Sequence, residues 1–246
     1  MGQDQSTPEN MDILLCGTSA EGQSLNDALR ALGHRVYHIA GSDNRATTTP
    51  DIPRFIAQGG KVDLVIDAAH PFDTASHTAA DAQAQRCGAP LWHLDRPKWD
   101  AQKYQAKSFD SFAQAIVPLN PGARVFVATG YEDAQSCLAR SDVHFFIRQI
   151  EKHRGPLAPN ITFLNSAPPF SVDEEIDGLQ PLNLTHMIIR NAGGGGARPK
   201  VDAAHHLGIK LHFITAPQVH FENAPHVIRY DDPQTIIAAL TKGPSK

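Results

Sequence analysis

The chain has 246 residues, of which 41% are hydrophobic and 20% charged, and its formal net charge is −4. This length allows one large core or two modest ones, because domains most often run to about 100–150 residues. The acidic balance and the lack of a long basic run argue against a nucleic-acid partner, and no apolar stretch is long enough to span a bilayer. We expect a soluble globular protein without nucleic-acid or membrane partners.

The first ten residues, 1–10, are polar and lack the apolar segment of a secretory signal, so we expect a flexible tail. Three scattered cysteines argue against a disulfide framework, and with the missing signal they favour a cytoplasmic location. Thirteen histidines raise the question of a metal, but their spacing is not that of a metal site. His205 and His206, for example, are adjacent and would diverge by about 100° on a helix. No metal is expected.

Strand and helix patterns alternate along the chain, beginning with a strand at Asp12–Cys16 that leads into a helix. Three times a helical segment ends at a glycine, which suits the left-handed residue after a helix, and a short apolar strand follows. These three units are Leu25–Leu32 with Gly33 and Val36–Ala40, Ala75–Cys87 with Gly88 and Leu91–Leu94, and Val201–Leu207 with Gly208 and Leu211–Ile214. Further strands are predicted at Val62–Asp67, Arg124–Ala128, His144–Ile147 and His186–Arg190. Continuous apolar strands between helices are typical of a doubly wound α/β fold with largely parallel sheets.

Two prolines and a glycine fall within Val117–Gly122, where the pattern pauses before a fresh strand. We interpret this as a boundary between two Rossmann-like domains, residues 11–118 and 122–246; a single wide sheet is the alternative. The proline-rich stretches 155–159 and 167–169 are predicted loops near the ligand, because ligands of open α/β sheets bind beyond the carboxyl ends of strands.

Polar groups follow the predicted strands of the first half. Gly17, Thr18 and Ser19 come directly after the first strand and could turn the chain toward a phosphate, although a plain strand-to-helix turn needs much the same residues. Asp67 ends the third strand, and His70 could contact an acidic substrate or carry a proton. The alternative is that Asp67 caps the next helix and His70 fills the turn.

A cationic and aromatic segment follows the fourth strand. Arg96, Lys98 and Trp99 place positive donors beside a flat ring, which suits an acidic conjugated ligand. An exposed loop with ordinary charges is the alternative.

Four consecutive glycines, Gly193–Gly196, separate an apolar strand from a helix in the second half. Glycines let the backbone approach an anion, and the free N–H groups of a helix start point at it. Arg190, Arg198 and Lys200 could add positive charge from the flanks. A flexible surface loop is the alternative, but the position favours phosphate binding.

Taken together, these segments resemble the precorrin-6A reductase family of the cobalamin (corrin ring) pathway. The matching segments occur in the family's order from Met11 to about Pro217: Gly17-Thr18, Asp67-Ala68-Ala69-His70-Pro71-Phe72, Arg96-Pro97-Lys98-Trp99, Thr129-Gly130, and Asn191-Ala192-Gly193-Gly194 with Lys200, Ala203-Ala204 and Leu207-Gly208. The resemblance implies two Rossmann-like domains with a cleft that holds NADPH and a tetrapyrrole. It also implies a reaction, hydride transfer to a double bond of precorrin-6A, and neighbouring pathway enzymes are candidate partners.

The resemblance and the residues together give the expected site. Coenzyme-binding residues are expected to be Gly17, Thr18, Ser19, Arg45, Thr129, Gly130, Asn191, Gly193, Gly194 and Gly195. Substrate-binding residues are expected to be Asp67, His70, Arg96, Lys98, Trp99, Arg190, Arg198 and Lys200, with His70 as the catalytic proton donor.

The chain departs from the family pattern at Cys16, where a glycine is usual, at Glu21, which falls one place late, and at Arg190, where a lysine is common. After the second strand, Asp43 would favour NADH, whereas Arg45 could pair with the 2′-phosphate of NADPH, so NADH remains open beside NADPH. Three other functions stay open: a dinucleotide- or tetrapyrrole-binding protein without catalysis, a reductase of another substrate, and a nucleotide-sugar or phosphate-ester enzyme.

Overall fold

The computed structural model describes residues 10–17, 19–39, 60–149, 158–166, 170–222, 224 and 226–241. The predictions for the tail at residues 1–9, for Thr18, for residues 40–45, and for the loops at 155–157 and 167–169 lie outside these ranges. Within the described residues, no helix combines the length and the apolar character needed to cross a membrane. The chain divides into two compact units: unit 1 comprises Met1–Pro97 and Pro217–Lys246, and unit 2 comprises Lys98–Ala216.

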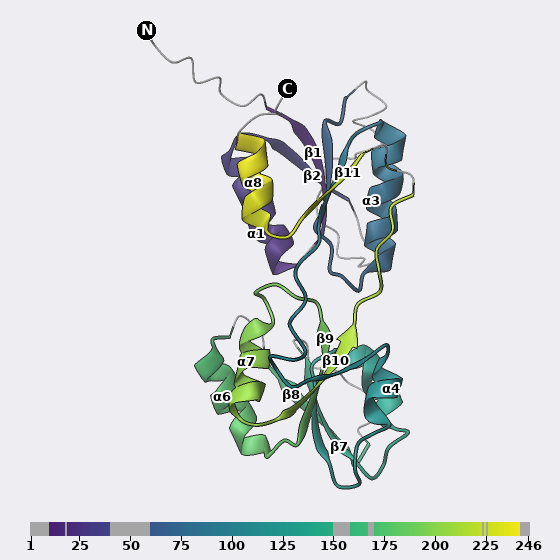
Figure 1. Ribbon diagram of the computed structural model, residues 1–246, viewed down its shortest axis with the longest axis vertical. Coiled ribbons are helices and arrows are strands. Elements are labelled where there is room, and N and C mark those ends of the chain that lie inside the picture. The colour runs from purple at the N-terminus through teal and green to yellow at the C-terminus, as the bar shows by residue number, and fades with distance from the viewer. Residues whose placement is uncertain are drawn as a thin grey trace. The chain divides into compact units, whose positions relative to one another are not determined.

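Unit 1 is a five-stranded parallel sheet of order β11-β4-β3-β1-β2. Helices α1 and α8 cover one face and α3 covers the other (Figure 1). The strands are β1 (Asp12–Cys16), β2 (Arg35–Ile39), β3 (Leu64–Asp67), β4 (Leu91–Leu94) and β11 (Val227–Tyr230), and the helices are α1 (Ala20–Ala31), α3 (Thr74–Cys87) and α8 (Pro233–Thr241).

Unit 2 is a six-stranded parallel sheet of order β5-β10-β9-β6-β7-β8. Helices α6 and α7 cover one face, and α4 lies on the other (Figure 1). The strands are β5 (Lys107–Phe109), β6 (Arg124–Val127), β7 (His144–Gln149), β8 (Ile161–Asn165), β9 (His186–Asn191) and β10 (Lys210–Thr215). The helices are α4 (Phe112–Ile116), α5 (Ala134–Cys137), α6 (Val172–Leu179) and α7 (Arg198–His206), and two 3-10 turns are η1 (Tyr131–Asp133) and η2 (Gln180–Leu182).

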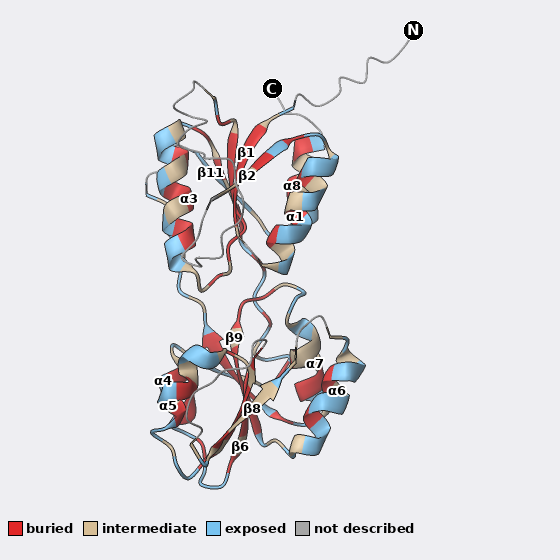
Figure 2. Cartoon of the chain, turned by 180° about the vertical axis from the view of Figure 1, so that it is seen from behind, coloured by how far each residue is buried: buried red, intermediate tan, exposed pale blue. Residues whose placement is uncertain are grey.

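The central strands carry the core of each unit, as their buried colouring in Figure 2 shows. In unit 1 the two faces of β1 alternate, so that Ile13 and Leu15 pack under α1 and α8 while Leu14 and Cys16 pack under α3. In unit 2 Phe126 and Phe213 are fully buried in the layer under α6 and α7. Helices on both faces of a parallel sheet explain the continuous apolar strands, and the predicted α/β class with two largely parallel sheets is confirmed.

The boundary expected at 118–122 differs from the division in the structure. Strand β5 lies in unit 2 because it pairs with β10, so unit 2 already begins at Lys98. Strand β11 lies in unit 1 because it pairs with β4. Helix α8, which follows it, packs against both β11 and α1. The Pro–Gly stretch 117–122 is therefore a turn inside unit 2, and the expected second domain loses its C-terminal part to unit 1.

The strand order reverses once in the middle of each sheet. In unit 1 the chain moves from β1 outward to β2, and β3 then starts again on the other side of β1. In unit 2 it moves from β6 through β7 to β8, and β9 then starts on the other side of β6. Such topological switch points, at the carboxyl ends of the strands, are where open α/β sheets bind ligands.

Candidate nucleotide and substrate site

The glycine segment after β9 lies at the switch point of unit 2. Gly193 and Gly194 have φ values of 68° and 67°, a left-handed conformation that side chains rarely adopt. Asn191 braces the turn, because its amide donates to the backbone carbonyl of Trp99 (2.9 Å) and accepts from the Trp99 backbone N–H (2.9 Å). The Trp99 indole N–H in turn donates to the Gly194 carbonyl (3.1 Å). Trp99 thus holds the segment at both Asn191 and Gly194, unlike the flexible loop that was the alternative.

Helix α7 starts directly after this turn. Its N-cap residue Ala197 makes no side-chain hydrogen bond, but the Arg198 N–H already donates to the Gly195 carbonyl (3.3 Å) and Pro199 has no N–H, so the helix start offers few donors to an anion. Across the switch point, Thr129 and Gly130 follow β6, the neighbour of β9. The Thr129 hydroxyl is buried and has no hydrogen-bond partner among the described residues. The braced glycine turn and the unsatisfied hydroxyl fit the phosphates of a dinucleotide.

The predicted cations of unit 2 differ in their surroundings. Arg190 pairs with Glu132 (3.0 Å), and Arg198 is half-exposed beside Asp202 (3.6 Å). Lys200 lies in the first turn of α7, and burial lowers its pKa, while the carboxylate of Glu175 opposes that shift. Gly195 and Lys98 are both exposed, and Lys98 is the first residue of unit 2.

The first glycine turn, after β1, lies at the switch point of unit 1. Gly17 has a φ of +130°, and a Cβ there would lie 2.4 Å from the carbonyl oxygen of Ala68, in the turn after the neighbouring β3. Ser19 caps α1, since its hydroxyl accepts from the Gly22 N–H (3.2 Å). Gly17 is therefore required for the close approach of two backbone turns.

Arg96, expected to bind substrate, instead connects these two turns. Its side chain is only 4% exposed. One terminal nitrogen donates to the hydroxyl of Ser19 (3.1 Å) and to the carbonyls of Ala68 (3.3 Å) and Ala69 (3.1 Å), and the other donates to Glu21 (3.3 Å). A guanidinium occupied by four protein acceptors differs from the open cation that a substrate carboxylate needs. Trp99 also differs from the expected ligand platform, because it is 7% exposed and packs on Phe213 in the core of unit 2.

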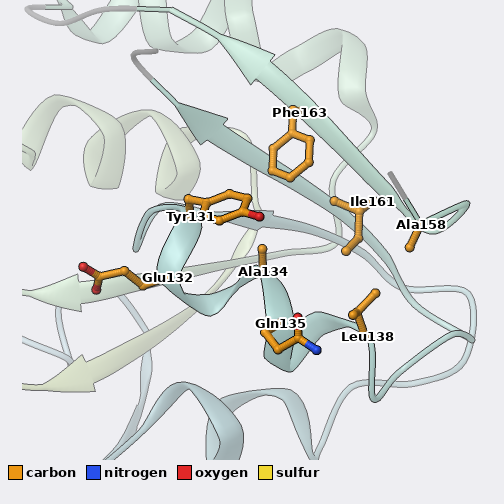
Figure 3. A pocket seen from close by; sticks show the side chains of 8 residues that line it. All are labelled: Tyr131, Glu132, Ala134, Gln135, Leu138, Ala158, Ile161 and Phe163. Carbon is orange, nitrogen blue, oxygen red and sulfur yellow. The ribbon is translucent and has the colours of Figure 1, made fainter. Parts of the chain in front are cut away.

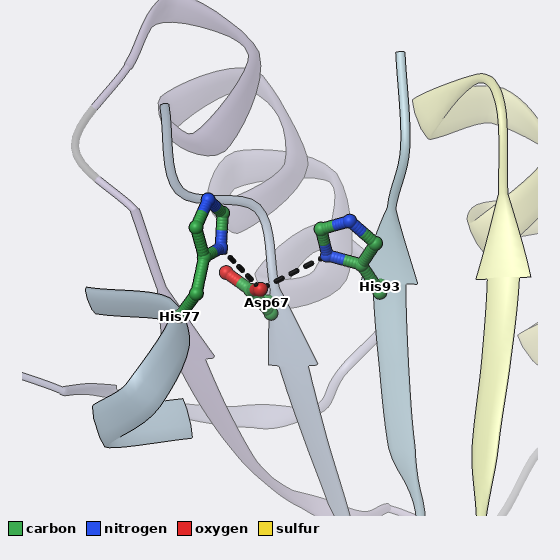
Figure 4. A group of neighbouring side chains, drawn as sticks. All are labelled: Asp67, His77 and His93. Atoms are coloured by element: carbon green, nitrogen blue, oxygen red, sulfur yellow. Dashed lines mark hydrogen bonds and ion pairs between the residues drawn. The ribbon is translucent and has the colours of Figure 1, made fainter. Parts of the chain in front are cut away.

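Asp67, expected to face the ligand or to cap α3, is fully buried and does neither. One oxygen accepts hydrogen bonds from Nδ1 of His77 (2.6 Å) and Nδ1 of His93 (2.9 Å), and the other accepts from the Ala69 N–H (3.1 Å). Figure 4 shows the carboxylate between the two imidazoles, which come from α3 and β4. The N-cap of α3 is Asp73. Sequence reasoning missed His77 and His93, because they lie 10 and 26 residues from Asp67 on a helix and a strand and share no local pattern.

These three side chains also form a group that could hold a metal ion. A tetrahedral ion bound at 2.0–2.1 Å would separate two of its ligand atoms by about 3.3 Å. The observed separations of 2.6 and 2.9 Å are instead those of charge-assisted hydrogen bonds. The geometry therefore fits a buried hydrogen-bond network better than a metal site.

This network predicts a loss of stability in acid. Burial alone would raise the pKa of Asp67 from 3.8, but the hydrogen bonds from His77 and His93 outweigh it and lower the pKa to about 2. A carboxyl group whose pKa is depressed in the folded state stabilises it above the unfolded pKa, and this contribution is lost as the pH falls toward 2. We expect about 2 kcal/mol of the free energy of unfolding to be lost as the pH falls from the ordinary pKa of 3.8 to about 2. Urea unfolding of the wild type and of Asp67→Asn between pH 6 and pH 2 should show it.

The control for this comparison is Asp27→Asn, since Asp27 is exposed on α1. Asp67→Asn should be less stable than wild type at neutral pH, because an amide cannot accept from both histidines and also from the Ala69 N–H. The difference in free energy of unfolding between wild type and variant should become smaller in acid for Asp67→Asn and stay constant for Asp27→Asn. A gap that is constant for both variants would contradict the assigned hydrogen bonds.

His70, the expected proton donor, lies in the turn between β3 and α3 and is partly exposed. Its Nδ1 accepts from the Phe72 N–H (3.3 Å), and the two rings are 5.8 Å apart. Its place beyond the carboxyl end of β3 is the one predicted.

A surface pocket of about 140 Å³ lies in unit 2 between α5 and the edge strand β8. Figure 3 shows Tyr131 and Phe163 on one side of it and Leu138 with Ile161 on another. None of the predicted site residues within the described ranges lines this pocket. Those residues lie at or after strand ends in the two units instead.

The chain is similar over most of its length to known proteins. The family model described as precorrin-6x reductase CbiJ/CobK matches residues 12–240. The precorrin-6A reductase of Rhodobacter capsulatus is 30% identical over 223 residues, which cover 84% of this chain and 88% of that protein. That of Mycobacterium tuberculosis is 29% identical, covering 83% and 88%. The solved structure of CobK precorrin-6A reductase has a TM-score of 0.78 and 26% identity, and covers 93% of this chain and 95% of its own. The chain therefore belongs to the precorrin-6x reductase family, CbiJ/CobK.

Proposed function

We propose that the protein reduces precorrin-6A in cobalamin biosynthesis, with a nicotinamide coenzyme as hydride donor. The relatives that span most of the chain are precorrin-6A reductases. The observation that carries the proposal is the placement of both glycine turns at the points where the strand order of each sheet reverses. Ligands of open α/β sheets bind at such points, and a dinucleotide brings phosphates that need close backbone contact.

The coenzyme supplies the hydride. The protein therefore has to bind the coenzyme and the substrate, orient them toward each other, and exclude water. In unit 2 the turn at Gly193–Gly195 and the Thr129 hydroxyl would hold phosphate oxygens. In unit 1 the turn at Gly17 and Ser19 is the second candidate for phosphate contact. NADPH is the proposed coenzyme. The reductase family supports a nicotinamide coenzyme in general, without distinguishing NADPH from NADH.

The substrate is multiply negative, so its carboxylates require cationic partners. Lys98, Arg190, Arg198 and Lys200 are the proposed partners, and each is at least partly accessible in its unit. Arg96 is not among them, because its donors bind the two turns of unit 1. Reduction also adds a proton, and His70 is proposed to deliver it from the turn after β3.

The test is coenzyme oxidation by the purified protein. Absorbance at the reduced-nicotinamide band should fall only when precorrin-6A is present, with either NADPH or NADH, and the product should gain two mass units. His70→Gln should lower kcat more than it raises KM if His70 provides the proton. Oxidation of neither coenzyme with precorrin-6A would refute the proposal.

A further inference from the structure

Three uncharged polar side chains form a row across the carboxyl ends of neighbouring strands in unit 2. Strands β7 and β8 pair at Gln149 and Asn165, which are the last residues of both strands. Strands β6 and β7 pair last at Val127 and Ile147, and Thr129 and Gln149 follow these two residues at the same interval. Side chains two residues apart on a strand share a face of the sheet. The register, continued past the end of β6, therefore places Thr129 next to Gln149, and Gln149 next to Asn165.

Gln149, in the middle of this row, has a hydrogen-bonding group that the protein does not use. The residue is 9% exposed, and its amide nitrogen donates to the side-chain oxygen of Asn165 (2.8 Å). This hydrogen bond leaves the carbonyl oxygen Oε1 as the remaining group, and among the described residues Oε1 is buried without a hydrogen-bond partner. A buried acceptor without a donor destabilises a fold and is rare in native proteins. The unused oxygen therefore indicates a ligand that donates a hydrogen bond.

The chemistry of the row favours a hydroxyl group as that donor. The Gln149 oxygen is a neutral acceptor, and the Thr129 hydroxyl beside it both donates and accepts. The row itself carries no charge, and the carboxylates that follow Gly130, Glu132 and Asp133, both lie against Arg190 (3.0 and 3.9 Å). A sugar offers several hydroxyl groups in a fixed arrangement, and the adenosine ribose of a dinucleotide is directly attached to a phosphate. Thr129 is already proposed to contact a phosphate.

The position of Gln149 is the one that binds ribose in dinucleotide-binding folds. In these folds a glycine turn after the first strand meets the pyrophosphate, and an acidic side chain about 20 residues further on binds the 2′-OH of the adenosine ribose. In unit 2 the turn after β6 contains Gly130, with a φ of 99°, and Gln149 follows at this spacing, at the end of β7. An amide thus stands where a carboxylate is usual.

We infer that Gln149 binds the adenosine ribose of the coenzyme and determines the choice between NADPH and NADH. The inference rests on the proposed function, because it assigns one part of that coenzyme to this row. A carboxylate in this place would accept from the 2′-OH of NADH and repel the 2′-phosphate of NADPH. The Gln149 amide accepts from a ribose hydroxyl without this repulsion, so the site admits NADPH. Because Gln149 ends its strand, rotation of its side chain brings the enclosed amide to the ligand without moving the sheet.

The main experiment compares Gln149→Glu with Gln180→Glu, which adds the same charge at an exposed residue of η2. This control lies at the other end of the sheet, because the Leu182 carbonyl of η2 accepts from Arg124, the first residue of β6 (2.8 Å). The dissociation constants of NADPH and NADH are measured by fluorescence without substrate. In Gln149→Glu the NADPH constant should rise about tenfold or more relative to the NADH constant, because only NADPH carries the repelled phosphate. Gln180→Glu should keep both wild-type constants.

A second variant, Gln149→Met, removes the acceptor and keeps most of the side-chain volume. The dissociation constants of both coenzymes should rise about threefold to tenfold, the usual effect of one lost neutral hydrogen bond. The Tm of the coenzyme-free protein should not fall, because the substitution removes a buried acceptor that has no partner. If Gln149 only serves the fold, or its oxygen only binds a buried water, the Tm should fall and both constants should stay unchanged.

The ribose site and the reaction can fail separately. The rise in Tm with adenosine 2′,5′-bisphosphate or with 5′-AMP reports binding of the adenosine half without turnover. In Gln149→Glu the rise with the bisphosphate should be lost and the rise with 5′-AMP retained. A protein that behaves in this way but does not oxidise coenzyme with precorrin-6A would keep the site and refute the reaction. A folded Gln149→Glu with the wild-type ratio of constants would overturn the inference, as would unchanged constants in Gln149→Met where the first variant does not fold.

Discussion

Gly17→Ala is expected to lower the free energy of unfolding by about 3 kcal/mol or more and to abolish coenzyme binding at this turn. The φ of +130° at Gly17 is strained for any residue with a side chain, and the new Cβ would lie 2.4 Å from the Ala68 carbonyl oxygen. That atom belongs to the backbone, so the contact can be relieved only by moving one turn away from the other. Both turns flank the switch point of unit 1, and the displacement therefore affects the proposed site directly. Urea unfolding and an NADPH fluorescence titration check the two parts of this expectation.

The matched control is Gly88→Ala, at the glycine that ends α3. Gly88 is also left-handed, with a φ of 62°, but a Cβ there would meet nothing within 4 Å. Its substitution should cost about 1–2 kcal/mol, from the backbone conformation alone, and leave NADPH binding unchanged. Equal destabilisation by the two substitutions would show that the close approach to Ala68 is not what requires Gly17.

Much of the fold could be predicted because local sequence patterns determine where its strands begin and its helices end. The strand Asp12–Cys16 agrees residue for residue with β1, and the helix stops at Gly33, Gly88 and Gly208 each precede a strand. These signals need only a few neighbouring residues. The domain division could not be read in the same way, because it depends on β11 crossing back to pair with β4, more than a hundred residues earlier. A turn such as 117–122 has the composition of a boundary without being one.

For the candidate site, the sequence indicated which residues follow the strand ends, and parallel strands bring those ends to one edge of each sheet. The sequence did not indicate the hydrogen-bond partners of these residues, since the burial of a side chain depends on tertiary packing. Asp67 and Arg96 have the composition of ligand-binding groups, yet each is surrounded by protein partners, and the histidines on Asp67 lie 10 and 26 residues away. Gln149 gave no signal, since a glutamine at the end of a strand is usually solvated.

Arg96→Met is expected to lower the free energy of unfolding by about 3–5 kcal/mol, the usual cost of removing one member of a buried charged network. The guanidinium serves four acceptors on two turns, and methionine fills part of its volume without donating a hydrogen bond. The carbonyls of Ala68 and Ala69 would then lose a donor, and Glu21 would lose its cation. Urea unfolding of the variant and of wild type at pH 7 measures the effect.

Two further variants separate stability from function at this position. Arg86→Met, at an exposed arginine in the last turn of α3, should change the free energy of unfolding by less than about 0.5 kcal/mol. Glu21→Gln should cost less than Arg96→Met, because Glu21 is 18% exposed and accepts from one guanidinium nitrogen at 3.3 Å. If Arg96 binds only the protein, Arg96→Met should also weaken coenzyme binding by displacing the turn at Gly17, whereas KM for precorrin-6A at saturating coenzyme should change little. A stable Arg96→Met protein with a large rise in that KM alone would return Arg96 to the substrate-binding role that the sequence suggested.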